Sequence, residues 1–233
     1  MAIRVHRYTD AAGLNTGVAD LLSRHIATVQ SRGRSVALCL SDGTADICAA
    51  CTHSFDAERI SLWWSDERFV DVTDPLRVST KTLAALGTAF RFAPNRVHPM
   101  PTAYGNLDVD AAALAYANEL GNTTFDLALL AMGADGSVAG LTPGSKVFTE
   151  QSQHTVAGFT DEIGGRLTLT MRALERSQAV WFIAIGKEVA NALVKTISDD
   201  ETMPSGALRG RRETHIFADD AAADQLPWFS CEV

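Results

Sequence analysis

A glycine-rich loop from Met132 to Ser145 holds the first side chains in this sequence that could do chemistry. It follows an apolar run, FDLALLA, and it contains four glycines and one acid, Asp135. Glycines allow backbone N–H groups to approach an anion such as a phosphate closely. The reactive side chains are Asp135 and Ser137, and a neutral serine cannot take a proton from water at pH 7 unaided. The loop therefore predicts an anion site in which no base sits beside the reactive groups.

Three further loops follow apolar runs in the same way. The turn SDGTA spans residues 41–45, the segment SDERFV spans residues 65–70, and the sequence IGKE places Lys187 in the first turn of an expected helix. A lysine in that position opposes the helix dipole, which is unfavourable for stability. It is favourable if an anion lies between the lysine and the helix N-terminus. Lys187 is therefore a candidate ligand for a phosphate group.

The four loops are expected to meet, because ligands in an open parallel sheet bind beyond the carboxyl ends of the strands. Taken singly, each loop has an ordinary explanation. A glycine turn connects a strand to a helix, residues 66–68 form a solvated acidic turn, and Lys187 is simply exposed. Their convergence at neighbouring strand ends favours a site for a small phosphorylated substrate. No His, Cys, Asp and Glu residues have metal-ligand spacing, so no metal is expected.

Strands alternate with helices along the whole chain. The expected strands are 3–8 (at an edge of the sheet), 35–41, 59–65, 96–99, 125–132, 154–159, 166–170, 179–186 and 214–219. The expected helices are one from Asp10 to Gly33 and others at 80–89, 109–120, 187–197 and 221–226. This pattern predicts an α/β fold with three layers, in which a mostly parallel open sheet carries helices on both faces. We expect a single domain, 1–233.

Composition excludes several classes of protein. The chain has 233 residues, of which 46% are hydrophobic, and a formal net charge of −8 without a basic cluster, so nucleic acid is not an expected partner. The longest strongly apolar run, AVWFIAI, is too short to cross a bilayer, and the amino terminus does not resemble a signal peptide. We therefore expect a soluble, cytoplasmic protein that does not bind membranes. Either a monomer or a homodimer fits the sequence.

The pair Cys48 and Cys51 forms a C-x-x-C pattern. A redox role requires such a pair at the point where a strand opens into a helix, since the helix N-terminus lowers the thiol pKa. Here the expected strand ends near Ser41, so the pair is expected well inside the following helix. A zinc site would require a second pair of ligands, which the sequence lacks. We therefore interpret both cysteines as small apolar residues on a buried helix face.

Three segments together resemble the 6-phosphogluconolactonase family, which shares its fold with glucosamine-6-phosphate deaminases. They are SDERFV, FDLALLAMGADGSVAGLTPGS and RLTLTMRALERSQAVWFIAIGKE, and the resemblance extends in order over nearly the whole chain. It implies a Rossmann-like fold and hydrolysis of 6-phosphogluconolactone to 6-phosphogluconate in the pentose phosphate pathway. The implied partner is a small phosphorylated sugar lactone, and no cofactor is implied.

The resemblance also implies two sets of site residues. Those for catalysis are Asp66, Arg68, Asp135 and Ser137. Those for binding the substrate and its phosphate are Ser41, Gly43, Thr44, Gly133, Gly136, Arg166 and Lys187. In this arrangement Asp66 or Asp135 orients or deprotonates water, and Arg68 stabilises the developing oxyanion or a sugar oxygen.

Three positions depart from the pattern of the family. Ser137 stands where the family has the histidine that is presumed to activate water, Asp42 stands in the phosphate turn, and Val78 replaces an asparagine. Two hypotheses follow. The protein is a lactonase whose activity is impaired by the missing base, or it is a degenerate homologue that binds a phosphosugar or a partner without turnover. A deaminase or isomerase gains nothing, because that pattern carries the same histidine.

Overall fold

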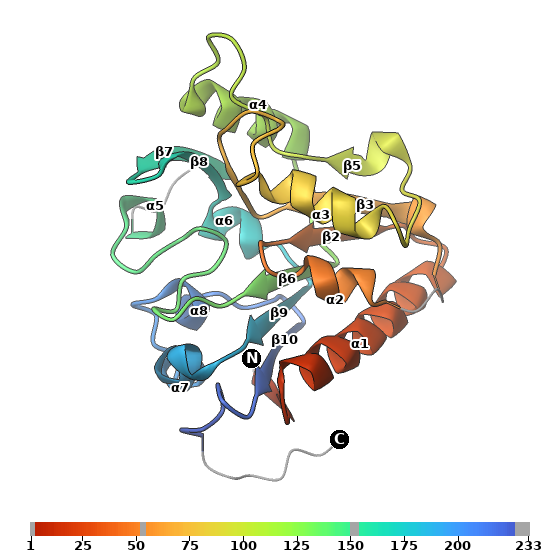
Figure 1. The fold of residues 1–233 in the computed structure, drawn as a ribbon, viewed down its shortest axis with the longest axis vertical. Helices are drawn as coiled ribbons and strands as arrows, with labels where there is room; N and C mark the ends of the chain where they lie inside the picture. Colours follow the sequence, from red (N-terminus) through yellow and green to blue (C-terminus); the bar gives the residue numbers. More distant parts are fainter. Residues whose placement is uncertain (1–2, 52–54, 150–153, 227–233) are drawn as a thin grey trace.

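The computed structural model describes residues 3–51, 55–149 and 154–226. Its centre is a seven-stranded sheet in the order β1-β10-β9-β6-β2-β3-β5, in which every neighbouring pair is parallel (Figure 1). The strands are β1 Ile3–Tyr8, β2 Val36–Leu40, β3 Ile60–Trp64, β5 Val97–His98, β6 Leu127–Ala131, β9 Ala179–Ala184 and β10 Glu213–Asp219. The predicted α/β class is thus confirmed, and β1 is the edge strand that was expected.

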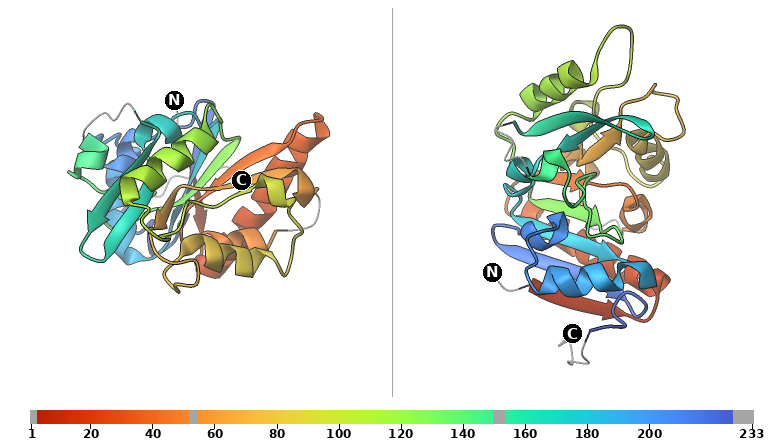
Figure 2. Two further views of the ribbon diagram at one scale, coloured as in Figure 1. Left: turned by 90° about the horizontal axis from the view of Figure 1, so that it is seen from above. Right: turned by 90° about the vertical axis from the view of Figure 1, so that its left-hand side faces the viewer.

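Helices cover both faces of this sheet (Figure 2). They are α1 Ala11–Ser31, α2 Ala45–Ala49, α3 Val78–Leu86, α4 Val109–Leu120, α5 Lys146–Thr149, α6 Met171–Leu174, α7 Ala190–Ile197 and α8 Pro204–Ala207. Residues of α1, α2 and α3 belong to one hydrophobic cluster, and residues of α4, α6 and α7 belong to another. None of the helices in the described part of the chain is long and apolar enough to span a membrane.

Alternate side chains of each central strand enter opposite clusters. In β6, Leu127 and Leu129 join the cluster under α1, whereas Ala128 and Leu130 join the cluster under α4. All of them are fully buried. Because successive side chains of a strand point to opposite faces, a strand that is buried on both faces must be apolar at every position. This explains the uninterrupted apolar run that precedes the glycine-rich loop.

A second, three-stranded antiparallel sheet lies beside the main one. It consists of β4 Asp66–Arg68, β8 Gly164–Leu169 and β7 Val156–Asp161, in the order β4-β8-β7. The prediction that residues 66–68 form a turn was wrong. Their backbone pairs with β8, with Asp66 opposite Thr168 and Arg68 opposite Arg166. Sequence reasoning missed this strand because its hydrogen-bond partners lie about a hundred residues away in the chain.

Two further local predictions need correction. Residues 221–226 form hydrogen-bonded turns rather than a helix, and the Asp219 carboxylate accepts a hydrogen bond from the Ala222 N–H. Helix α2 ends at Ala49, so Cys51 lies just beyond it and not well inside a helix. Both Cys48 and Cys51 are buried and free, and burial raises the pKa of the Cys51 thiol to about 11. These properties support the apolar interpretation and disfavour thiolate chemistry.

A buried carboxylate, that of Glu67, begins helix α3 two residues earlier than predicted. Its oxygens accept hydrogen bonds from the N–H groups of Val78 and Ser79 at 2.7 and 2.8 Å, and from the N–H of Arg68 at 2.9 Å. The Arg77 guanidinium lies 3.9 Å away and is also buried. Burial lowers the pKa of Arg77, and the Glu67 charge opposes that shift. Glu67 therefore has a structural role, in which it fixes β4 to α3.

Replacing Glu67 with alanine should lower the free energy of unfolding by about 3 kcal/mol, because it leaves the buried Arg77 guanidinium without its counter-charge and two helix N–H groups without their acceptor. Urea unfolding followed by circular dichroism measures this loss. The exposed Glu58 provides a matched control, since Glu58→Ala should change the stability by less than about 0.5 kcal/mol. Equal, small losses in both variants would show that Glu67 does not stabilise the start of α3.

Candidate active site

The candidate site lies at the carboxyl edge of the main sheet. Strands β9, β6, β2 and β3 are neighbours and parallel, so the loops that follow them begin at one edge. From β2 the sheet continues through β3 to β5, whereas β6 lies on the other side of β2 and continues to β9. This reversal is the topological switch point at which open α/β sheets bind ligands. The prediction that the four loops meet at one edge is confirmed.

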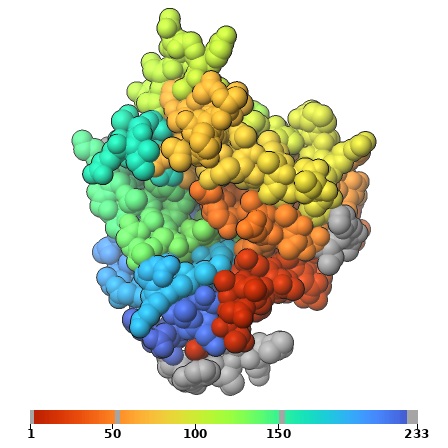
Figure 3. Space-filling model, in the orientation of Figure 1, coloured from red at the N-terminus to blue at the C-terminus, as the bar shows by residue number. Residues whose placement is uncertain are grey.

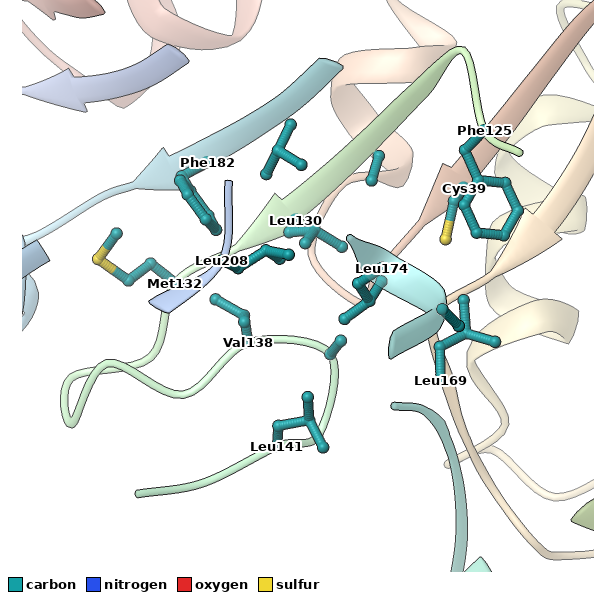
Figure 4. Packing of buried hydrophobic residues seen from close by; sticks show 14 of the residues in the cluster. Cys39, Phe125, Leu130, Met132, Val138, Leu141, Leu169, Leu174, Phe182 and Leu208 are labelled. Atoms are coloured by element: carbon teal, nitrogen blue, oxygen red, sulfur yellow. The ribbon is translucent and has the colours of Figure 1, made fainter. Parts of the chain in front are cut away.

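The loop after β6 is held from below by apolar side chains. Val138 and Leu141 are buried and point into the cluster that contains Leu130, Phe182 and Leu208 (Figure 4). The backbones of Val138 and Leu141 also pair with each other through two hydrogen bonds. The loop reaches the surface beside the segment that follows β9, drawn in light blue in Figure 3. Its shape therefore depends on the core and does not require a ligand.

The N–H groups of the first two loop glycines are used within the loop. Gly133 donates to the carbonyl of Ser137 at 2.8 Å, and Gly136 donates to the carbonyl of Gly133 at 3.0 Å. Gly136 has φ +83°, and a Cβ there would lie 2.5 Å from the sulfur of Met203. Gly133 and Gly136 therefore shape the loop, and their own N–H groups are engaged by it.

Ser137 lies folded over the start of the loop. Its Oγ would lie 2.1 Å from a Cβ at Gly133, which shows how closely the hydroxyl approaches that glycine. The Ser137 N–H donates to the Asp135 carboxylate at 2.9 Å. Asp135 itself is exposed, whereas Ser137 is half-buried. The structure thus brings these two predicted residues together, with the carboxylate beside the backbone of the serine.

A network of two arginines and two carboxylates lies against this loop. Arg166 Nη2 donates to Asp66 Oδ2 at 2.6 Å, and Arg68 Nη1 donates to both oxygens of Asp161 at 2.7 and 2.8 Å. Arg166 Nη1 is 3.8 Å from Asp161, which links the two pairs. Burial would raise the pKa of Asp161, but hydrogen bonds from Arg68 and from two backbone N–H groups produce a net decrease. Asp161 thus stays ionised and holds the two guanidinium groups side by side.

Asp66 is placed to orient Arg166. It is almost fully buried, and its second oxygen accepts a hydrogen bond from the Ser65 hydroxyl at 2.9 Å. Gly140 of the loop contacts this pair directly, since a Cβ there would lie 3.2 Å from Arg166 Nη2 and 3.3 Å from Asp66 Oδ2. The loop backbone and the arginine network therefore form one continuous surface.

The turn after β2 closes against the end of β6. The Ser41 hydroxyl accepts the Ala131 N–H at 2.8 Å, and the buried Thr44 hydroxyl donates to the Ser41 carbonyl at 2.8 Å. Gly43 has φ +80°, and a Cβ there would lie 3.5 Å from the Cβ of Ala131. Ser41 and Thr44 therefore fix the turn through their side chains, at the switch point.

Asp42, which would repel a phosphate, is paired with a cation. Lys81 Nζ lies 3.3 and 3.4 Å from the two oxygens of the Asp42 carboxylate, and one of these oxygens also accepts the Gly43 N–H at 3.0 Å. Both side chains are about half exposed, at 62% and 48%. Sequence reasoning missed Lys81, which is a fourth cationic group at this edge besides Arg68, Arg166 and Lys187.

Lys187 begins a 3-10 turn that precedes α7, and it is exposed. It makes no ion pair or hydrogen bond with the other residues that the structure describes. The preceding Gly186 has φ +90°, and its N–H donates to the buried Asp219 carboxylate at the end of β10. Asp219, which the sequence did not single out, therefore fixes the turn that carries Lys187.

The arrangement combines an anion-binding side with a polarising side. Lys187 and the turn after β2 supply positive charge and backbone N–H groups, and the Arg68 and Arg166 guanidiniums can stabilise a developing negative charge. The described residues contain no group of three or more His, Cys, Asp and Glu that could hold a metal ion.

A family model described as glucosamine-6-phosphate isomerases/6-phosphogluconolactonase matches residues 9–217. The chain belongs to this family. It is 34% identical to a 6-phosphogluconolactonase of Streptomyces coelicolor, over 96% of this chain and 94% of the relative. It is 31% identical to a 6-phosphogluconolactonase of Mycobacterium tuberculosis, over 86% of this chain and 89% of the relative.

Solved structures of family members share the fold. The 6-phosphogluconolactonase from Thermotoga maritima superposes with a TM-score of 0.83 at 24% identity, covering 93% of this chain and 99% of the other. A monomeric glucosamine-6-phosphate deaminase superposes with a TM-score of 0.79 at 18% identity, covering 95% of this chain and 99% of the other. At these identities the likeness establishes the three-layer α/β architecture.

Replacing Gly140 with alanine should displace the Arg166 guanidinium, because the added Cβ would enter the contact with Asp66 and Arg166. Gly144 is a matched control in the same loop. It has φ +72°, close to the +70° of Gly140, but nothing lies within 4 Å of a Cβ there. Both variants should lose about 1 kcal/mol from the left-handed backbone. Only Gly140→Ala should lower the free energy of unfolding further, and only in this variant should the guanidinium NMR resonances of Arg166 shift. Equal stability losses, with unshifted resonances in both variants, would contradict the contact.

Proposed function

We propose that this protein hydrolyses 6-phosphogluconolactone to 6-phosphogluconate. The observation that carries the proposal is that Lys187, the turn after β2 and the two arginines follow or adjoin neighbouring strands at one edge of the sheet. Among the described residues, Lys187 has no ion-pair partner. Such a site suits a ligand with a phosphate at one end and a carbonyl at the other. The relatives in Streptomyces coelicolor and Mycobacterium tuberculosis are 6-phosphogluconolactonases, which supports the same reaction.

In the proposed complex, the phosphate binds to Lys187 and to the backbone of Gly43 and Thr44. Its negative charge lies next to the exposed ammonium group, which has no competing carboxylate partner among the described residues. A phosphate at this position also competes with Asp42 for the Gly43 N–H and for Lys81. Lys81 therefore offsets part of the repulsion that Asp42 would exert.

The lactone carbonyl lies toward Arg68 and Arg166 in this proposal. Water adds to the carbonyl carbon and gives a proton to a base. The carbonyl oxygen becomes an oxyanion, which the guanidinium groups stabilise. The bond from this carbon to the ring oxygen then breaks, and the ring oxygen takes up a proton to become a hydroxyl group. We assign Asp66 to orienting Arg166, because its two oxygens already accept hydrogen bonds from Arg166 and Ser65.

The mechanism requires a base that accepts the proton of water. By its resemblance to the family, the sequence has Ser137 where a histidine is expected, and Asp135 is the one carboxylate in the loop. A δ-lactone is an activated ester, so a weak base suffices for some turnover. The same observation favours a second candidate function, in which the protein binds a phosphosugar without hydrolysing a lactone.

Lys187→Ala should weaken the binding of 6-phosphogluconate by about 1–3 kcal/mol, the contribution of a charge-assisted hydrogen bond. Isothermal titration calorimetry gives the dissociation constant of the wild type and the variant. Lys195 is exposed on the following helix α7, and Lys195→Ala removes the same charge from the protein. This control variant should leave the affinity for 6-phosphogluconate nearly unchanged. An unchanged affinity in Lys187→Ala would exclude Lys187 as the phosphate ligand.

Ser137→His should raise the lactonase kcat by at least about tenfold, because general-base catalysis typically contributes ~10²–10⁴-fold. Asp135 would fix the tautomer of the new imidazole. The measurement compares the steady-state consumption of the lactone near neutral pH by the wild type and the variant, after subtraction of spontaneous hydrolysis. Ser145→His adds a histidine to the same loop at another position and should give no gain.

The two candidate functions separate in this experiment. Measurable turnover by the wild type, with a gain in Ser137→His only, supports an impaired lactonase. A folded Ser137→His variant that binds 6-phosphogluconate but is no faster than the wild type would contradict the assignment of position 137 to the base. Together with an inactive wild type, it would favour the binding function.

A further inference from the structure

A cavity of about 550 Å³ lies at the amino edge of the main sheet, at the opposite end of the strands from the candidate active site. Its walls come from the end of α1 and from the segments that lead into β2, β6, β9 and β10. This volume falls within the range of small-molecule sites in proteins. The mechanism proposed above uses none of the residues in its walls.

One wall of the cavity is electrically balanced and firmly held. Arg34 Nη2 donates to Asp126 Oδ1 at 2.7 Å, and Asp126 Oδ2 accepts the Ala37 N–H at 2.9 Å. Arg59 in turn donates to the Arg34 carbonyl at 2.8 Å. The Asp126 side chain is only 7% exposed. The charges of Arg34 and Asp126 therefore cancel, and this wall does not need a ligand to be ordered.

The second carboxylate in the walls, that of Glu213, faces two imidazoles. One of its oxygens is 3.9 Å from His25 Nδ1, and the other is 3.5 Å from His215 Nε2. His25 also lines the cavity, and its Nε2 is buried without a hydrogen-bond partner in the described residues. Burial lowers the pKa of His25, against the opposing effect of Glu213. The walls thus contain a buried imidazole nitrogen without a hydrogen-bond partner, His25 Nε2, near the Glu213 carboxylate.

Two arginines in the walls have no such partner. The side chains of Arg32 and Arg212 are exposed, and neither guanidinium makes an ion pair or a hydrogen bond with another residue in the described part of the chain. Both line the same cavity, in a protein whose formal net charge is −8. With Arg34 and Asp126 cancelling, the charges that remain in the walls are those of Arg32, Arg212 and Glu213, an excess of one positive charge. Two guanidinium groups around one concave site match a ligand with a negatively charged group that both can bind.

We propose that this cavity binds a small organic anion, whose charged group lies between Arg32 and Arg212 and whose polar body contacts the wall near His25. Guanidinium groups bind carboxylates and phosphates through paired hydrogen bonds, so a phosphate monoester and a dicarboxylate share the required chemistry. A neutral or cationic metabolite would leave both arginines uncompensated. The site is independent of the lactonase proposal, because it shares no residue with the site at the carboxyl edge.

Isothermal titration calorimetry with glycerol 2-phosphate, succinate and glycerol tests this assignment. The protein should carry Lys187→Ala, which removes the proposed phosphate ligand at the other edge. Glycerol 2-phosphate or succinate should bind, and glycerol should not. Tighter binding of glycerol 2-phosphate indicates that the natural ligand is a phosphate monoester, and tighter binding of succinate indicates a dicarboxylate.

Arg32→Gln combined with Arg212→Gln should weaken this binding by ~10-fold or more, as expected for the loss of charge-assisted hydrogen bonds. The matched control combines Arg24→Gln with Arg211→Gln. It removes two other arginines, so the two double variants have the same net charge as each other. It should change the affinity less than about twofold, which corresponds to a few tenths of a kcal/mol. Circular dichroism verifies the fold of both double variants.

Two results would overturn the proposal. One is the absence of binding by either dianion at about 10 mM, a concentration that detects even millimolar affinity. The other is an equal loss of affinity in the two double variants, which would indicate a general effect of net charge. Neither result bears on lactone hydrolysis, which is measured separately, so the failure of one proposal is distinguishable from the failure of the other.

Discussion

The parallel pairing of β2 with β6 is the contact on which the rest of the site depends. On the β2 side, β3 and β5 come from the first half of the chain; on the β6 side, β9 and β10 come from the second half, and β1 at that edge comes from its beginning. The loops after these two strands consequently turn away from each other, and Ser41 joins them through its hydrogen bond to the Ala131 N–H. Lys187 follows β9, the neighbour of β6. Arg68 on β4 and Lys81 on α3 follow β3, the neighbour of β2, and Arg166 lies on β8, which pairs with β4.

The main sheet could be predicted from sequence because each of its central strands carries its own signal. A strand with both faces buried is apolar at every position, as in β6 and β9, and such runs are visible without knowledge of their neighbours. Helix α1 could also be predicted from sequence, because Asp10 caps it and apolar residues recur on one face. These features are local, and they require no information about distant parts of the chain.

The second sheet and the network on it were less predictable, since they depend on contacts between distant residues. Residues 66–68 are polar and short, and only their pairing with β8 makes them a strand. The same pairing brings Arg68 and Arg166 together, and Asp161 then becomes their shared partner. The Asp42 carboxylate pairs with Lys81, but the position of Lys81 on α3 could not be inferred from its place in the sequence. Charge partners of this kind follow from tertiary structure.

The anchoring of the glycine-rich loop by Val138 and Leu141 has an evolutionary consequence. Because the core and the internal hydrogen bonds of the loop determine its path, the side chain at position 137 contributes little to holding that path. A lineage can therefore exchange the reactive group there without an accompanying loss of foldability. The chemistry of this loop can therefore change by single substitutions on an unchanged scaffold.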